Sequence, residues 1–205
     1  MMQSTSDANL PSSSGVTVSA LKAHGGAALS ANSWTNGASP EFSWTAGSGT
    51  DSGVKGYCLY LGTNASADPI TTKGLLGNSG VNNGGNCQFM VTSTTADMAT
   101  AGYIGTPLTS SNSNYYLIVK TIDNAGNVSS DSATFSFKFD DTPPTNPGFI
   151  SGPSGFVNNK AVTLTWQTTG GSAPDDANSG LAGLQYRIGS SGTWYGDAHN
   201  GSEIS

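Results

Sequence analysis

The amino-acid sequence predicts an all-β protein built from antiparallel β-sandwiches. Apolar and polar residues alternate over several short segments, turn-forming Gly, Asn and Ser separate those segments, and no stretch shows a convincing helical stripe. Charged residues make up only 10% of the chain, against roughly 25% in an average globular protein. The Gly, Ser, Thr and Asn that take their place are typical of extracellular all-β proteins.

An internal repeat divides the chain into two copies. Residues 34–44 run from Trp34 to Trp44, and residues 156–166 run from Phe156 to Trp166 with the same spacing. Farther along, residues 52–62 align with residues 179–189 without a gap, and every apolar position coincides. A duplication of this kind predicts two structural units of one type.

In the first copy, the alternation predicts four strands and assigns each side chain to a face, because successive side chains of a strand point to opposite sides. The side chains predicted to face the core are Phe42, Trp44, Tyr57, Leu59, Leu61, Tyr115, Leu117, Val119, Phe135, Phe137 and Phe139. Those predicted to face outward are Ser43, Cys58, Tyr60, Tyr116, Ile118, Lys120, Ser136 and Lys138. Between the last two strands, the Asp-Asn-Ala-Gly-Asn run at 123–127 predicts a turn.

The second copy repeats the first half of this pattern. Its predicted core-facing residues are Val162, Leu164, Trp166, Leu184, Tyr186 and Ile188. The recognisable strands of the first copy run from Trp34 to Phe139, so Ser205 falls near the middle of the second module. The expectation is that the second sandwich is truncated and that the region after Asp141 is less stable, because half a sandwich leaves an inner face uncovered.

These observations predict four segments. Residues 1–29 form an N-terminal linker and first-strand region, and residues 30–140 form a complete sandwich with an elaborated loop at 63–105. Residues 141–147 contain three prolines and form a semi-rigid linker. Residues 148–205 form the partial second module. The long loop is a candidate for binding specificity, because rigid sandwiches display function on loops; the alternative is loop drift without function.

Charge and hydropathy exclude several classes of partner. The formal net charge is −6, with seven Lys and Arg residues in all, so nucleic acid is disfavoured, since binding it requires clustered cations. Anionic membrane surfaces are disfavoured for the same reason. No segment approaches 18 consecutive apolar residues, so the sequence predicts no membrane insertion within this segment.

Cys58 and Cys87 are the only cysteines, and an even count in an apparently exported chain favours a disulfide. Because the alternation places Cys58 on the outer face of its strand, a bond to Cys87 would fasten the long loop onto the sheet and would not cross the core. The alternative is two unpaired thiols.

No arrangement of residues indicates catalysis, and we expect the chain not to be an enzyme. It contains no nucleophile elbow, phosphate-binding loop or metal-binding His pair, and the two histidines, His24 and His199, lie in different modules. The only glutamates are Glu41 and Glu203, which offer no evident acid pair for sugar hydrolysis. Trp194 and Tyr195 follow a Gly-Ser-Ser-Gly turn and are candidate ligand-binding residues that could stack on a sugar ring; the alternative is packing within their own module.

Several of these motifs resemble a known family. The stretch from Tyr115 to Ser129, followed by an aromatic strand and Asp141-Thr142-Pro143-Pro144, resembles the repeat ends of bacterial immunoglobulin-like and fibronectin type III-like modules of large surface proteins. The Trp strand followed by Ser-Gly-Val/Leu-x-Gly is similar to the second and third strands of these modules. The resemblance covers roughly residues 30–205 and implies tandem immunoglobulin-like antiparallel β-sandwiches.

The resemblance also implies a function. It indicates a non-catalytic structural spacer or adhesive module of a secreted or cell-surface multidomain protein, with no catalytic residues. Its partners would be neighbouring modules of the same chain and a cell-surface protein or glycan. The alternative is a carbohydrate-binding accessory region of a secreted polysaccharide-degrading enzyme.

Asp123, Asp140 and Asp141 are candidate metal ligands near the module junction, with calcium as the possible cofactor. Calcium takes six to eight oxygen ligands. Adjacent strand residues point to opposite faces, however, so Asp140 and Asp141 cannot easily converge on one ion. A solvated linker without a metal is the favoured interpretation, and we expect no cofactor.

Overall fold

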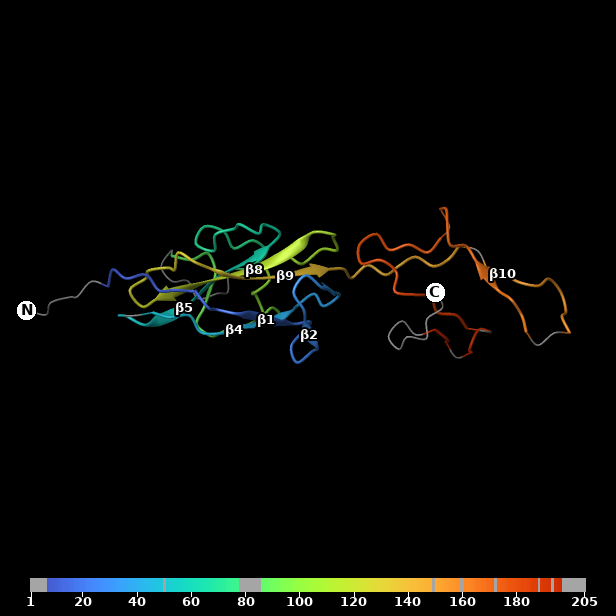
Figure 1. The fold of residues 1–205 in the computed structure, drawn as a ribbon, viewed down its shortest axis with the longest axis horizontal. Helices are drawn as coiled ribbons and strands as arrows, with labels where there is room; N and C mark the ends of the chain where they lie inside the picture. Colours follow the sequence, from blue (N-terminus) through green and yellow to red (C-terminus); the bar gives the residue numbers. More distant parts are fainter. Residues whose placement is uncertain are drawn as a thin grey trace, which may run out of the picture. The chain divides into compact units, whose positions relative to one another are not determined.

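The computed structural model describes residues 7–49, 51–77, 86–148, 150–158, 161–171, 173–187, 189–192 and 194–196, and shows an all-β chain (Figure 1). The chain divides into two compact units, Met1–Asp141 and Thr142–Ser205. The division falls at the start of the predicted proline-rich linker. Over the described ranges, no helix is long and apolar enough to cross a membrane.

The first unit contains two sheets. Sheet one has four strands in the order β2-β1-β4-β7, all antiparallel. The strands are β1 (Val18–Leu21), β2 (Ala28–Leu29), β4 (Glu41–Trp44) and β7 (Thr95–Asp97). The predicted N-terminal region of residues 1–29 therefore supplies two strands of this sheet.

Sheet two has five strands in the order β3-β9-β8-β5-β6. The strands are β3 (Trp34–Thr35), β5 (Val54–Gly62), β6 (Met90–Val91), β8 (Asn114–Asp123) and β9 (Ala133–Phe139). Every pairing is antiparallel except β3 with β9, which is parallel. In Figure 1, β5, β8 and β9 lie along one side of the unit, and β1, β2 and β4 lie along the other.

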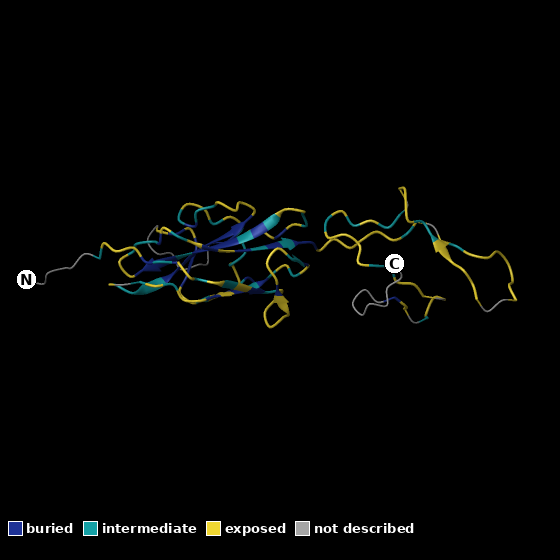
Figure 2. Ribbon diagram, in the orientation of Figure 1, coloured by how far each residue is buried: buried dark blue, intermediate teal, exposed yellow. Residues whose placement is uncertain are grey.

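The two sheets enclose one hydrophobic core, so the unit is a β-sandwich. All of the residues predicted to face inward are buried in it (Figure 2). Phe42 of β4 contacts Phe135 and Phe137 of β9, with ring centroids 6.2 and 5.9 Å apart. The predicted alternation is confirmed along all four strands, and the turn at 123–127 lies where it was predicted, with Gly126 at a positive φ of 95°.

The segment predicted as an elaborated loop, residues 63–105, contains two of these strands. β6 extends sheet two beyond β5, and β7 completes sheet one beside β4. Both strands were missed because they are two or three residues long, which is too short to show an alternation. Ala96 of β7 is buried opposite Phe42 in the register, so this segment closes the sandwich as well as forming a loop.

The second unit differs from the prediction. Its named strands are β10 (Ile150–Ser151) and β11 (Thr165–Trp166), which form one antiparallel pair. Val162 and Leu164 were predicted to face a core but are 49% and 43% exposed. Residues 184–187 form no strand: Leu184 and Tyr186 lie in isolated bridges, the latter with Tyr195, and Ile188 lies outside the described residues.

The physical reason is the lack of a covering sheet. In the first unit, β4 is buried by the aromatic side chains of β9. The described residues of the second unit contain no counterpart of β8 and β9, so no hydrophobic side chain is buried there.

Tyr115, near the start of β8, ties the preceding connection to the core. Its hydroxyl accepts a hydrogen bond from the N–H of Thr109 (3.1 Å) and donates one to the carbonyl of the same residue (2.9 Å). Its ring stacks on Phe137 with centroids 5.7 Å apart. One side chain thus fixes both a loop and a core position.

We expect Tyr115→Phe to lower the free energy of unfolding by about 1–3 kcal/mol, because it leaves part-buried groups of Thr109 without their partner. The matched control is Tyr116→Phe, whose ring lies on the outer face and is only half-buried. Urea denaturation of the two variants measures the difference. Equal losses in both would contradict a specific role for the Tyr115 hydroxyl.

Candidate functional site

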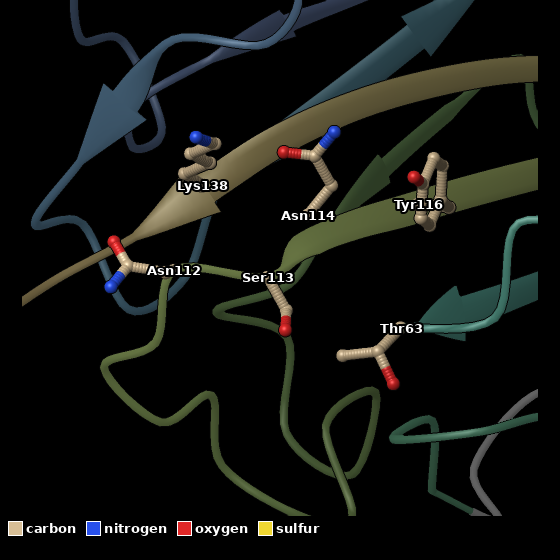
Figure 3. A pocket seen from close by; sticks show the side chains of 6 residues that line it. All are labelled: Thr63, Asn112, Ser113, Asn114, Tyr116 and Lys138. Carbon is tan, nitrogen blue, oxygen red and sulfur yellow. The ribbon is translucent and has the colours of Figure 1, made fainter. Parts of the chain in front are cut away.

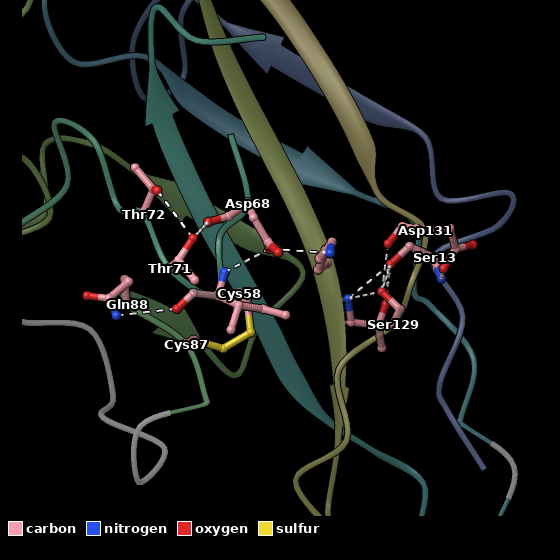
Figure 4. Close-up of polar contacts among 12 residues, drawn as sticks. Ser13, Cys58, Asp68, Thr71, Thr72, Cys87, Gln88, Ser129 and Asp131 are labelled. Atoms are coloured by element: carbon pink, nitrogen blue, oxygen red, sulfur yellow. Dashed lines mark hydrogen bonds and ion pairs between the residues drawn. A yellow bond between two sulfur atoms is a disulfide. The ribbon is translucent and has the colours of Figure 1, made fainter. Parts of the chain in front are cut away.

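The candidate functional site is the segment 63–105, which a disulfide fastens to the outer face of sheet two. Cys58 on β5 is bonded to Cys87, with Cα atoms 5.4 Å apart (Figure 4). Cys58 lies on the face opposite to Tyr57 and Leu59, so the bond does not cross the core. It joins this segment to the sheet.

A second apolar cluster lies beneath the segment. Cys58, Cys87, Met90 and Ile122 are buried together, with Val128 packed against them. Ile122 comes from β8 and Met90 from β6. The segment therefore buries part of the outer face of sheet two, which explains why an outward-facing cysteine is fully buried.

Polar contacts hold the beginning of the segment. The ammonium of Lys120, whose side chain is only 14% exposed, lies 3.3 Å from the Asp68 carboxylate. The same carboxylate accepts the N–H of Ile70 (3.0 Å), and Gln88 donates its side-chain amide to the Ile70 carbonyl (3.3 Å) (Figure 4). Because the cation is largely desolvated, we expect this ion pair to be stronger than a surface pair.

Backbone bonds hold the middle of the segment. Leu75 donates its N–H to the Leu61 carbonyl (2.7 Å), and Gly105 donates to the Leu75 carbonyl (2.8 Å). Gly74 has a φ of +64°, and a Cβ there would lie 2.1 Å from the Leu61 carbonyl oxygen. Only glycine can adopt this backbone conformation so close to the Leu61 carbonyl, so the described part of the segment has a defined backbone structure. Residues 78–85 lie outside the described residues.

The three candidate metal ligands are not brought together. Asp123 is buried at the end of β8, and its carboxylate accepts the backbone N–H (2.8 Å) and side-chain amide (2.9 Å) of Asn127. Asp140 and Asp141 follow β9 at the other end of the β8–β9 ladder, where Ser110 donates to Asp141 (2.6 Å). Across the described ranges, no group of three His, Cys, Asp or Glu side chains is arranged to hold a metal ion. Because β8 and β9 are antiparallel, Asp123 lies at the opposite end of their ladder from Asp140 and Asp141.

His24 has acidic neighbours that the sequence did not reveal. Its Nδ1 lies 3.2 Å from Glu41 and 3.1 Å from Asp97. Glu41 and Asp97 are direct cross-strand partners on β4 and β7. The contact was missed because Asp97 lies in a strand that the sequence did not predict. His199 and Glu203 lie outside the described residues.

Trp194 and Tyr195 both remain exposed, at 56% and 52%. The ring of Tyr195 stacks on Tyr186 with centroids 5.3 Å apart, and the Arg187 guanidinium lies 4.9 Å from the Trp194 ring centroid. Tyr195 is therefore partly engaged by its own unit, and Trp194 carries a cation over its ring. The geometry leaves their predicted ligand-binding role as a hypothesis.

The chain was compared with known proteins at three levels. No protein-family model, curated protein or solved structure matches it.

We expect loss of the disulfide, in the double variant Cys58→Ala/Cys87→Ala, to lower the free energy of unfolding by about 2–4 kcal/mol, because the bond closes a loop in the unfolded chain. Limited proteolysis should then cut within residues 63–105 before it cuts β8 or β9. Adding a reductant to the double variant is the control and should change nothing further. Unchanged stability and an unchanged cleavage pattern would contradict the anchoring role.

Proposed function

We propose that this chain is a non-catalytic structural spacer or adhesive module, built from tandem immunoglobulin-like sandwiches, in a secreted or cell-surface multidomain protein. The strand arrangement of the first unit supports the immunoglobulin-like part. One sheet is formed by β1, β4 and β7, and the other carries β5, β8 and β9 side by side, as in sandwiches of this type. The contact between the Tyr115 hydroxyl and Thr109, six residues upstream, matches the tyrosine corner of such folds.

The observation that carries the spacer role is where the chain enters and leaves the first unit. The N-terminal segment docks beside the turn that follows β8, where Ser13 bonds to Thr121 and Ser129 (2.9 and 3.0 Å). The chain leaves at Asp140, at the other end of β9 (Figure 1). The seven residues of β9 alone separate these ends by roughly 20 Å. Entry and exit at opposite ends of β9 suit a spacer.

The entry point is clamped by a network of hydrogen bonds. Ser12 and Ser48 exchange backbone bonds of 2.8 and 3.0 Å. Asp131 accepts the Ser13 N–H (2.9 Å) and the Ser12 hydroxyl (3.0 Å). Beneath them, the hydroxyls of Ser13, Thr121 and Ser129 form a buried cluster (Figure 4). A pull on the N-terminal segment therefore acts on several bonds at once.

The exit point is held by the parallel pairing of β3 with β9. Lys138 donates its N–H to the Ser33 carbonyl (2.9 Å), and Asp140 donates to the Thr35 carbonyl (3.0 Å). These two bonds tie the end of β9, where the chain leaves the unit, to β3. This arrangement suits a module that transmits tension.

Two further observations support the proposed extracellular location and tandem arrangement. Disulfides persist mainly in oxidising compartments, so the Cys58–Cys87 bond is compatible with an extracellular or cell-surface location. The duplicated pattern of residues 156–189 supports a tandem arrangement, in which neighbouring modules of the same chain are the first partners. No cofactor enters the proposal.

Single-molecule force spectroscopy tests the spacer role. With the full chain held at its ends, we expect the first unit to unfold in one cooperative event. The disulfide keeps the 29-residue span from Cys58 to Cys87 closed during this event. Reduction should therefore lengthen the unfolding step by roughly 100 Å, at about 3.5 Å per residue. If the first unit unfolds at a force no higher than that needed to open an isolated β-hairpin, the tension-bearing role is rejected.

The entry clamp also predicts a pH dependence. Partial burial raises the pKa of Asp131, but hydrogen bonds led by those from the Ser13 N–H and the Ser12 hydroxyl outweigh it, so the pKa lies below its ordinary value of 3.8. A carboxyl whose folded pKa is lowered adds stability above its unfolded pKa, and this stability is lost as the pH falls through the folded pKa.

We therefore expect Asp131→Asn to be less stable than the wild type near neutral pH and the difference to shrink as the pH drops below about 3.8. Comparing the two proteins removes the contribution of the other carboxylates. Urea denaturation at a series of pH values measures the effect. A difference that does not change with pH would show that the charge of Asp131 does not stabilise the clamp.

A further inference from the structure

A polar pocket opens on the outer face of sheet two, where β8 begins and β9 ends. It has a volume of about 420 Å³, and its lining residues are Thr63, Asn112, Ser113, Asn114, Tyr116 and Lys138 (Figure 3). Small-molecule sites usually have volumes of about 300–1,000 Å³. Thr63, Asn112 and Ser113 are exposed, so the pocket is open to solvent.

The strand register places a fixed cation at this pocket. Trp34 of β3 and Asn114 of β8 both pair directly with Lys138 of β9. The Lys138 ammonium lies 5.1 Å from the centroid of the Trp34 ring, a cation–π contact that restrains the long side chain. The cation is therefore held in place at the wall of the pocket.

Asn114 lies beside this cation, and its side chain is directed toward Asn32. Its amide nitrogen is directed to the Asn32 side-chain oxygen (3.4 Å), which also accepts the Ser136 hydroxyl (2.7 Å). Its Oδ1 is buried and has no hydrogen-bond partner in the described part of the chain. Figure 3 shows this oxygen on the side of Asn114 that faces Lys138. Because this oxygen has less than 1 Å² of accessible surface, a ligand in the pocket cannot reach it, and Asn114 contributes the wall beside Lys138.

The lining defines the chemistry of a ligand. Lys138 is the only charged residue of the lining, in a chain of net charge −6. The ammonium calls for an anion. Amides and hydroxyls of the lining can pair with hydroxyls, and the ring of Tyr116 offers a surface for a pyranose ring. Carboxylate and hydroxyl groups on a polyhydroxylated ring are the chemistry of a sugar acid.

We propose that this pocket binds a hexuronic acid unit of a glycan, with its carboxylate on Lys138 and its ring hydroxyls on the exposed hydroxyls of Thr63 and Ser113. The site deepens the adhesive part of the proposed function and rests on it, whereas the spacer role needs no ligand. It also differs from the sequence-predicted pair Trp194 and Tyr195, which lies in the second unit.

Binding can be measured by NMR titration of the full chain with D-glucuronate and D-galacturonate, with D-glucose and D-galactose as neutral counterparts. We expect the uronates to shift the Asn114 side-chain amide signals and to bind about tenfold or more tightly than the neutral sugars, because the bond to Lys138 is charge-assisted. Raising the salt concentration should weaken uronate binding.

Two variants and one matched control locate the site. Lys138→Met removes the ammonium but keeps an unbranched side chain next to Trp34, and Asn114→Asp is isosteric but repels a carboxylate. Each should weaken uronate binding about tenfold or more. Lys22→Met, at an exposed lysine that follows β1, should leave it unchanged. Thermal unfolding of each variant confirms that it is folded, and if one variant does not fold, the other still tests the site.

A uronate tetrasaccharide that binds more tightly than the monosaccharide supports a glycan as the source of the ligand. Lactate binding as tightly as uronate would overturn the sugar assignment. Equal binding of acidic and neutral sugars, no binding of either, or uronate binding that survives both variants would overturn the site. None of these results changes the unfolding length measured under force, so failure of this site is distinguishable from failure of the spacer role.

Discussion

The first unit depends on the contact between Phe42 of β4 and the rings of Phe135 and Phe137 of β9, because this contact joins the two sheets. Phe42 and Phe137 are fully buried. Large aromatic side chains supply most of the buried area of such a core, and their edge-to-face and tilted packing adds specificity. Once these rings face inward, strand alternation forces their sequence neighbours outward. The packing of the core therefore determines which residues lie on the outer faces of the sheets.

The outer face of sheet two is divided along β8. At its C-terminal end, Lys120 and Ile122 lie under the segment 63–105, which the Cys58–Cys87 bond and the ion pair with Asp68 hold down. At its N-terminal end, Asn114 and Tyr116 remain open beside Lys138. The division follows the chemistry of the outward positions. Apolar side chains such as Ile122 favour a cover, and the covered Lys120 is paired with Asp68, whereas the Lys138 ammonium, unpaired among the described residues, and the amides remain favourable in water.

The sequence predicted the long strands of the first unit well, because β5, β8 and β9 each span several alternations. Short strands such as β7 carry no such signal, since their conformation is set by the neighbour with which they pair. The contact of His24 with Asp97 was unpredictable for the same reason. In the second unit, Val162 and Leu164 alternate with polar residues as in a strand. Their side chains remain exposed because no second sheet of the described residues covers them.

The pocket shows another limit of sequence reasoning. Alternation placed Tyr116 and Lys138 on the outer face, which is confirmed. It did not give the register, and the register is what sets Lys138 beside both Trp34 and Asn114. These three residues lie far apart in the sequence and belong to no motif. Their meeting is a property of the parallel and antiparallel pairings of β9, which only the fold defines.

Lys138 belongs to both the proposed spacer role and the proposed binding site. Its backbone N–H bonds to the Ser33 carbonyl in the pairing that holds the exit of the chain. Its side chain points out of the sheet and sits over Trp34 at the pocket. In these two proposed roles, tension would act on the backbone bonds and a ligand on the side chain, so the two tasks would use different groups of one residue. Because backbone hydrogen bonding is nearly independent of the outward side chain, the outer face of such a spacer can acquire a ligand site without weakening the ladder beneath it.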